Sequence, residues 1–444
     1  MKRKFNISPA QIIVLGFLGI ILLGALLLCL PFASLSGSTS FVDAIFTSTS
    51  ATCVTGLVSL TTATHWTLFG KIVILILIQI GGLGFMTFIS LTAIIAKKNI
   101  GLKERKLIMQ SAGSIELNGI FALIKRIVFG TLLVEGCGAL FLSFRFWTLG
   151  FGFGKGLWYG VFHSISAFCN AGFDILGNDS FISFHNDPFI LITTSLLIII
   201  GGIGFIVWGD IVKHGLKFKK YRLHSKLVIV TTATLLFGGT LLFYIAERGY
   251  AFVDLNEGEK WLNAFFQSTT LRTAGFASVD QAELSPGGTV ISFLFMLIGG
   301  SPGSTAGGIK TITFAVMILN AVSFARNKDN ITVFKKRIEP STIKHACAII
   351  AIYLVAACVI TVAITMIESG SGFSLDDIVF EVVSAIGTVG LSRGITPLFT
   401  AGSKLLLCLT MFFGRMGGLT LLLAIAEKQS GSKIERPYEK ILIG

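Results

Sequence analysis

The chain has 444 residues, of which 53% are hydrophobic and only 13% are charged, and its formal net charge is +13. This composition lies outside the range of soluble domains and is typical of proteins that cross a membrane many times. A basic balance can indicate nucleic acid or an anionic partner, but the placement of the charges, described below, argues against nucleic acid.

Eight apolar runs are each long enough to cross a hydrocarbon core of roughly 30 Å, which takes about 20 helical residues. In chain order they lie near residues 11–30, 71–96, 127–146, 189–208, 226–246, 289–324, 346–367 and 404–426, and the sixth is interrupted by glycines. The first run has no small-residue cleavage site before Pro31, so we interpret it as a span and not as a signal peptide.

Between the two spans of each successive pair lies a segment of sixteen residues, and the four segments align without a gap. They are residues 41–56 (FVDAIFTSTSATCVTG), 157–172 (LWYGVFHSISAFCNAG), 260–275 (KWLNAFFQSTTLRTAG) and 375–390 (LDDIVFEVVSAIGTVG). Their sixth column is Phe46, Phe162, Phe265 and Phe380, their tenth is Ser50, Ser166, Thr269 and Ser384, and their last is Gly56, Gly172, Gly275 and Gly390. A repeat of this kind predicts structural units arranged around an axis, which in a membrane would be a pore.

We therefore predict an all-α polytopic membrane protein. It would consist of four covalently linked helix–pore-loop–helix repeats in a pseudo-fourfold arrangement around one pore. The repeats would occupy residues 1–98, 99–219, 220–328 and 329–444, the third with a broken second span and the last with a tail.

The basic residues indicate how the spans are oriented. Of the 36 Lys and Arg residues, 26 lie in five stretches, at 2–4, 97–126, 213–226, 326–344 and 428–440. The positive-inside rule places these stretches, and with them both termini, in the cytoplasm. The opposite face holds the four segments and most acidic residues. These carboxylates either concentrate cations in a vestibule or are ordinary solvated loop charges, and both interpretations remain open.

The last four residues of each segment are expected to be irregular backbone, which is tolerated at membrane depth only where it lines a cavity or is buried in protein. Nothing ionisable recurs in these columns, so the four copies share only a main chain. Rings of carbonyl oxygens replace the hydration shell of potassium in selectivity filters, and the carboxyl ends of the short helices would add negative potential. The alternative is a set of re-entrant packing helices that bind no ion.

We assign a potassium ion to the backbone of these four tetrapeptides: Cys53, Val54, Thr55 and Gly56; Cys169, Asn170, Ala171 and Gly172; Arg272, Thr273, Ala274 and Gly275; Gly387, Thr388, Val389 and Gly390. Arg272 is a cation in a predicted cation site. Its side chain is therefore expected to point behind the filter, toward a carboxylate or backbone carbonyls.

Residues 299–308 read GGSPGSTAGG, and five glycines and a proline in ten residues cannot remain helical. This stretch is expected to break the sixth span at mid-membrane. We interpret the glycines at 81–84 and 201–204 instead as close helix crossings. Arg415 lies within the eighth span, where an arginine is a functional candidate by default, although it could also form a packing pair with Glu135.

The filter pieces TCVTGL, CNAGF, RTAGF and GTVGL, in four helix–segment–helix units over essentially the whole chain, resemble the membrane subunits of the Trk, Ktr and HKT potassium transporter superfamily. The chain looks most like the bacterial Ktr subunits called KtrB and KtrD. The resemblance implies potassium uptake through filters closed by the four glycines. Gly56 favours potassium, because sodium-preferring plant relatives have serine there.

The resemblance also implies a gate below the filter. It would be an intramembrane loop that obstructs the pore, with a lysine beside it and with Arg415 facing the pore as a barrier to cations. The corresponding residues are Gly299, Gly300, Ser301, Pro302, Gly303, Ser304, Thr305, Ala306, Gly307, Gly308 and Lys310.

The implied assembly is a homodimer in the bacterial cell membrane, in contact with its lipid. It would sit on a cytoplasmic octameric RCK ring of the KtrA or KtrC type, which binds a nucleotide (ATP or ADP, or NAD). Potassium would be the transported ion, sodium is left open as an activator, and no covalent cofactor is expected.

Two rival functions remain. One is a sodium-selective or sodium-coupled transporter of the same fold. The other is an intramembrane enzyme that uses Ser301 or the histidines at 65, 163, 185, 214, 224 and 345. No two of these histidines have metal-ligand spacing, and the seven cysteines include no Cys-x-x-Cys pair, so we expect transport and no enzyme activity.

Overall fold

The computed structural model describes residues 9–84, 120–177, 179–328 and 330–417. Its first half contains α1 (Pro9–Leu28), η1 (Pro31–Ala33), α2 (Phe41–Cys53), α3 (Thr62–His65), α4 (Leu68–Leu83), α7 (Ile120–Phe146), η2 (Trp147–Phe151), α8 (Phe153–Phe168), η3 (Ile182–Phe184), α9 (Pro188–Ile203), α10 (Phe205–His214) and η4 (Phe218–Lys220). Its second half contains α11 (Leu223–Glu247), α12 (Glu257–Thr270), α13 (Pro286–Leu297), α14 (Thr311–Ala325), β1 (Thr332–Val333), β2 (Lys336–Arg337), α15 (Pro340–Ile367), α16 (Leu375–Gly387), η5 (Thr396–Leu398) and α17 (Ala401–Met416).

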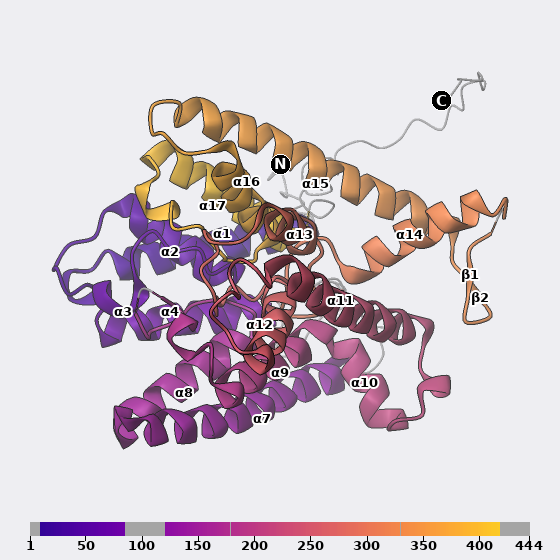
Figure 1. Ribbon diagram of the computed structural model, residues 1–444, viewed down its shortest axis with the longest axis horizontal. Coiled ribbons are helices and arrows are strands. Elements are labelled where there is room, and N and C mark those ends of the chain that lie inside the picture. Colours follow the sequence, from indigo (N-terminus) through magenta and orange to yellow (C-terminus); the bar gives the residue numbers. More distant parts are fainter. Residues whose placement is uncertain (1–8, 85–119, 178, 329, 418–444) are drawn as a thin grey trace, which may run out of the picture.

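The hairpin of β1 and β2 departs from the all-α prediction. Thr332 pairs with Arg337 and Val333 with Lys336 in an antiparallel register. The two residues between them have φ angles of 48° and 63°, which is the pair of left-handed conformations that a type I′ turn requires. The hairpin projects beyond the ends of α14 and α15 (Figure 1).

Four helices of the described residues are long and apolar enough to cross a membrane: α1, α7, α11 and α15. They coincide with the predicted spans at 11–30, 127–146, 226–246 and 346–367, so these four predictions are confirmed. The bent pair of α9 and α10 would be a fifth span if it is counted as one. The predicted spans at 71–96 and 404–426 begin in α4 and α17, and their later residues lie outside the described part of the chain.

Within the described residues, the second span of the second repeat is interrupted as well as that of the third, which alone was predicted to be broken. α4 ends at Leu83 and α17 at Met416, and the capping residues Gly84 and Gly417 have φ angles of 82° and 76°. Gly204, at 96°, separates α9 from α10 across a bend of 95°. A glycine in this conformation ends an α-helix without the steric cost that a side chain would add. The glycine clusters at 81–84 and 201–204 therefore terminate helices as well as permit close packing.

The close packing is also present. Gly81, Gly201 and Gly414 each lie against a main-chain carbonyl near the end of a short helix, and a side chain on any of them would collide with that carbonyl. Small residues allow this approach of backbones. The interpretation of these glycines as helix crossings thus holds alongside the helix break.

The short helices of the four aligned segments are α2, α8, α12 and α16, and each packs against the second span of the preceding unit. The contacts are α4 with α8, α9 with α12, α13 with α16 and α17 with α2. In Figure 1 the first three contacts each join neighbouring colours along the chain, and the fourth joins the yellow α17 to the indigo α2. The chain thus closes on itself through four contacts of the same kind.

Hydrogen-bonding caps determine where three of the short helices begin. The side chains of Ser40, Asn256 and Ser374 accept from backbone N–H groups in the first turns of α2, α12 and α16. Such caps satisfy donors that a helix leaves free at its start. Asn256 and Glu259 form a complete capping box.

In each of the last two units, a buried carboxylate holds the second span to the first span of the same unit. Glu247, at the end of α11, accepts from the hydroxyl of Ser285 at 2.7 Å, and Ser285 caps α13. Glu368, just after α15, accepts from the hydroxyl of Thr400 at 2.7 Å, and Thr400 caps α17. These bonds fix the outer ends of both helix pairs around the short helix between them.

Candidate functional site

A left-handed residue follows the end of every short helix, one to three residues past its last helical residue. Val54, Asn170, Thr273 and Thr388 have φ angles of 56°, 59°, 66° and 53°, and they are the fourteenth column of the aligned segments. A non-glycine residue in this conformation costs about 1–2 kcal/mol. Strain of this kind clusters at functional sites. The same distortion recurs four times at the predicted filter.

The four glycines that close the segments lie close to one another. Each faces the carbonyl oxygen that precedes the glycine of the next segment: Gly56 faces Ala171, Gly172 faces Ala274, Gly275 faces Val389 and Gly390 faces Thr55. A Cβ atom on any of the four would come within 2.8 Å of that oxygen, and their φ angles lie between 68° and 99°. Both the backbone and the available space therefore require glycine, and the four contacts form a closed ring.

Hydroxyl groups of the tenth column hold the filter backbone in three of the segments. The bonds are Ser50 to Gly56 at 3.1 Å and Ser384 to Gly390 at 3.0 Å, in which the hydroxyl accepts from the glycine N–H, and Ser166 to Phe173 at 2.7 Å, in which it donates to the carbonyl. All three hydroxyl residues are buried. The column found in the sequence thus has a bonding role next to the glycines.

In the third segment this role is shifted by one residue. Thr270 donates to the carbonyl of Phe276 at 2.7 Å, while Thr269 donates to Phe265 within its own helix at 2.8 Å. The phenylalanine column shifts as well, because Phe266 is fully buried whereas Phe265 is not. The gap-free alignment is therefore one position out of structural register in this helix.

Arg272 is buried, with 4% of its surface exposed, and its Nη2 lies 3.4 Å from the hydroxyl of Thr232 on α11. Its side chain thus reaches back to the first span of its own unit. The partner is a hydroxyl and not the carboxylate or backbone carbonyl that the sequence led us to expect.

The loop of residues 299–308 joins α13 to α14 and packs against the glycine cluster at the end of α9. Its hydrogen bonds are Ser301 N to Gly202 O at 3.0 Å, Thr305 N to Gly201 O at 3.3 Å, Phe205 N to Gly303 O at 2.9 Å and Thr305 Oγ1 to Phe168 O at 3.0 Å. A Cβ atom on Gly308 would lie 2.9 Å from the carbonyl oxygen of Gly387, and one on Gly307 would collide with the Thr388 hydroxyl. The loop therefore lies directly against the filter backbone.

Two cations contact this loop. Lys310 Nζ donates to the carbonyl of Ala306 at 2.7 Å. The guanidinium of Arg415 donates to the carbonyls of Thr305 and Gly81, and to that of Gly82 at 3.3 Å. Arg415 thus bridges the loop and the end of α4.

The contacts of Glu135 differ from the packing pair considered for Arg415. The Glu135 carboxylate accepts from Gln79 Nε2 at 3.2 Å, which joins α7 to α4. The Arg415 guanidinium donates to the carbonyl oxygens of Thr305 and Gly81.

Many carboxylates of the predicted vestibule are bound to other side chains. Ion pairs join Asp43 to Lys404, Asp187 to Arg145, Glu257 to Arg248 and Lys260, and Asp376 and Asp377 to Arg393. Paired carboxylates attract a passing cation less than free ones do, because their partners cancel part of the field. This observation weakens the interpretation of the outer face as a cation-concentrating vestibule.

Arg393 is absent from every set of residues that the sequence indicated. It lies three residues past the last aligned column, where the four copies no longer share a pattern. Its ion pairs with the start of α16 place it beside the outer end of the filter, and only the assembled structure reveals this.

Known proteins similar to this chain are transport proteins. The family model described as "Cation transport protein", TrkH, matches residues 2–436. The chain is 41% identical to the potassium/sodium uptake protein NtpJ of Enterococcus hirae, over 100% of this chain and 99% of that protein. It is 39% identical to the Ktr system potassium uptake protein B of Vibrio alginolyticus, over 100% and 96%, and 38% identical to the protein of that name from Bacillus subtilis, over 98% and 97%.

A solved structure has the same fold. The potassium transporter TrkH of Vibrio parahaemolyticus superposes with a TM-score of 0.74 at 19% identity, covering 95% of this chain and 86% of that one.

Proposed function

Since this chain belongs to the TrkH family of cation transport proteins, we propose that it is the pore-forming subunit of a potassium uptake system. The observation that carries the proposal is the closed ring of four glycines, each against the carbonyl preceding the next. Relatives covered over nearly their whole length are named as potassium uptake proteins. We infer from the ring that the four repeats surround one pore with pseudo-fourfold symmetry.

The chemistry of selection would reside in the main chain. The oxygens of Thr55, Ala171, Ala274 and Val389 would replace water around a partly dehydrated potassium ion, as carbonyl rings do in potassium filters. The carboxyl ends of α2, α8, α12 and α16 precede this ring and would add negative potential at it. Because the ligands would be main-chain oxygens, the side chains of the sixteen filter residues need not have the same chemistry in the four repeats.

The loop of residues 299–308 would gate the pore on the cytoplasmic side of the filter. Its contacts with Gly387 and Thr388 support this position. Arg415 would hold the loop through the Thr305 carbonyl and present a positive charge to cations below the filter. Movement of the loop would have to break that bond and the bonds to the end of α9, so the closed state is held by several weak contacts.

The proposed setting is the bacterial cell membrane, with both termini in the cytoplasm. The membrane potential is worth about 2.3 kcal/mol per unit charge per 100 mV, enough to accumulate a cation without chemical coupling. We propose a homodimer on an octameric, nucleotide-binding RCK ring, with the basic cytoplasmic stretches available for docking.

The sodium-linked alternative rests on one observation, the name of the NtpJ relative, which mentions both ions. Replacing Gly56 by serine tests it. If the native protein prefers potassium, Gly56→Ser should shift the flux toward sodium. Native flux carried better by sodium than by potassium would overturn the potassium proposal.

Complementation tests the main proposal. A bacterium that lacks potassium uptake should grow at low external potassium when it expresses the chain together with a regulatory ring subunit. Gly390→Asp should abolish this growth, whereas Ser301→Ala, which removes the hydroxyl required by the enzyme alternative, should leave it intact. Growth lost with Ser301→Ala and kept with Gly390→Asp would favour the enzyme.

A further inference from the structure

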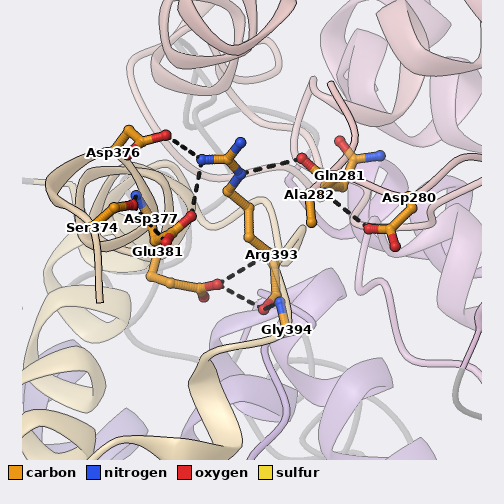
Figure 2. Close-up of polar contacts among 10 residues, drawn as sticks. Asp280, Gln281, Ala282, Ser374, Asp376, Asp377, Glu381, Arg393 and Gly394 are labelled. Atoms are coloured by element: carbon orange, nitrogen blue, oxygen red, sulfur yellow. Dashed lines mark hydrogen bonds and ion pairs between the residues drawn. The ribbon is translucent and has the colours of Figure 1, made fainter. Parts of the chain in front are cut away.

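The Arg393 guanidinium has three bonding partners at the outer end of the fourth filter segment. Its Nη1 lies 2.6 Å from Asp376 Oδ2 and 2.9 Å from Asp377 Oδ1, both at the start of α16. Its Nε donates to the carbonyl of Gln281 at 3.3 Å, in the loop that follows the third filter segment. Figure 2 shows the guanidinium between these two groups. Only 9% of the side chain is exposed.

The backbone of Arg393 is held as well. The Glu381 carboxylate, in the middle of α16 and fully buried, accepts from Arg393 N at 2.9 Å and from the Ser392 hydroxyl at 2.6 Å. Its other oxygen accepts from the Thr396 hydroxyl at 2.6 Å. One carboxylate thus ties the loop after Gly390 to the helix before it.

The second repeat has a bond in the same register. His163, in α8, is in the seventh column, as Glu381 is in α16, and its Nε2 accepts from Ile175 N at 3.4 Å. Ile175 and Arg393 are each three residues past their filter glycine. In both repeats, a polar side chain of the short helix before the filter (the pore helix, α8 or α16) therefore holds the backbone of the residues that follow the filter glycine.

The third repeat joins the same network. Gln267, buried in α12, donates to the Gln281 side chain at 2.7 Å. The carbonyl of Gln281 accepts from Arg393. A continuous path of polar contacts therefore runs from the pore helix of repeat three, through Gln281 and Arg393, to the pore helix of repeat four.

We propose that Arg393 is a positioning residue for ion selection, which couples the outer ends of the third and fourth filter segments so that the carbonyls of Ala274 and Val389 keep a fixed separation. These two carbonyls face neighbouring glycines of the ring, Gly172 and Gly275. A carbonyl ring discriminates between ions by its size and field. Losing the Arg393 contacts would let the separation of these carbonyls vary, so that the ring could also accommodate sodium. This inference rests on the proposed potassium function and adds a residue that determines its specificity.

Flux through purified protein in proteoliposomes tests the proposal, with the ratio of potassium to sodium permeability as the readout. Arg393→Gln should lower this ratio by about tenfold, the factor that corresponds to one charge-assisted hydrogen bond. The ratio separates positioning from electrostatics, because an altered surface charge would change both fluxes together. The matched control is Arg248→Gln, an exposed arginine paired with Glu257 in the third repeat, which should keep the wild-type ratio.

Arg393→Lys provides a second variant in case the glutamine protein does not fold. A lysine retains the charge opposite Asp376 but not the planar fork that reaches Gln281 as well, so its ratio should also fall. An unchanged ratio in either folded variant would overturn the proposal, and so would an equal fall in the Arg248→Gln control. Absence of potassium flux in the wild-type protein would instead refute the proposed function.

Discussion

The ring of filter glycines makes Gly390→Ala the most informative single substitution. Gly390 has a φ angle of 92°, and an alanine there costs about 1–2 kcal/mol in backbone strain. In addition, its Cβ would lie 2.8 Å from Gly56 Cα and would collide with the Thr55 carbonyl oxygen. Both neighbours are main chain, so neither can move aside by rotating a side chain.

A second glycine in the same loop separates these two effects. Gly394 has a φ angle of 86°, but a Cβ atom there would meet nothing within 4 Å. Gly394→Ala therefore carries the same backbone strain of about 1–2 kcal/mol without the contact with the ring. Gly390→Ala should lose more stability than Gly394→Ala, because the collision adds to the shared strain, and only Gly390→Ala should also move the Thr55 carbonyl.

The assay is potassium and rubidium uptake into proteoliposomes, combined with thermal unfolding of the purified protein. We expect Gly394→Ala to retain near-wild-type uptake and selectivity. Gly390→Ala should lose uptake by about tenfold or more, because 1.4 kcal/mol at one carbonyl ligand corresponds to a factor of ten. Wild-type uptake and selectivity in folded Gly390→Ala protein would refute the assignment of these carbonyls as ligands.

Three further predictions concern the gate and the outer helix ends. Replacing Arg415 by Gln should raise uptake about thirtyfold, since one charge taken to act on the ion from roughly 8 Å contributes about 2 kcal/mol at an effective dielectric constant of about 20, and each 1.4 kcal/mol is a factor of ten. Unchanged or reduced uptake by folded protein would contradict the barrier. Gly204→Ala, whose Cβ would lie 2.9 Å from the Pro302 carbonyl oxygen, should displace the gate loop and raise basal uptake, whereas Gly215→Ala, which is also left-handed but has open space around it, should not. Burial alone would raise the pKa of the Asp43 carboxyl, but hydrogen bonds from Ser40 and Lys404 outweigh burial and hold that pKa below its ordinary 3.8. The ionised Asp43 carboxyl therefore stabilises the folded state fully above about pH 4, and this stabilisation is lost as the pH falls through the folded-state pKa. Asp43→Asn should have a lower melting temperature than the wild type at pH 7, and its melting temperature should depend less on pH below about pH 4. A melting curve like that of the wild type at both pH values would exclude this role.

The repeat pattern located the filter because its requirements are local. Each copy needs a glycine that fits against a neighbouring carbonyl and a hydroxyl that reaches the backbone six or seven residues later. These residue types therefore recur in the same columns of the aligned segments. The third segment shows the limit of this reasoning. α12 ends at Thr270, five residues before Gly275, whereas the other three short helices end three or four residues before their glycines, and Thr270 takes the place predicted for Thr269.

Contacts between repeats could not be predicted in the same way. Arg415 meets the carbonyls of Thr305 and Gly81, which belong to two other repeats, and Arg393 meets Gln281 across a sequence separation of 112 residues. Neither pairing leaves a periodic trace in the chain. The helix ends before Gly84, Gly204 and Gly417 were not predicted for a different reason, because a glycine in an apolar run is compatible with both close packing and a helix end.

Anomalous diffraction from a heavy monovalent cation would locate the ion site that we propose. Crystals grown with rubidium or thallium, which replace potassium and scatter anomalously, would show where a dehydrated monovalent cation binds. We expect a peak inside the ring, shared by the carbonyl oxygens of Thr55, Ala171, Ala274 and Val389. A ring without a peak, or an ion held by carboxylate side chains elsewhere, would contradict it.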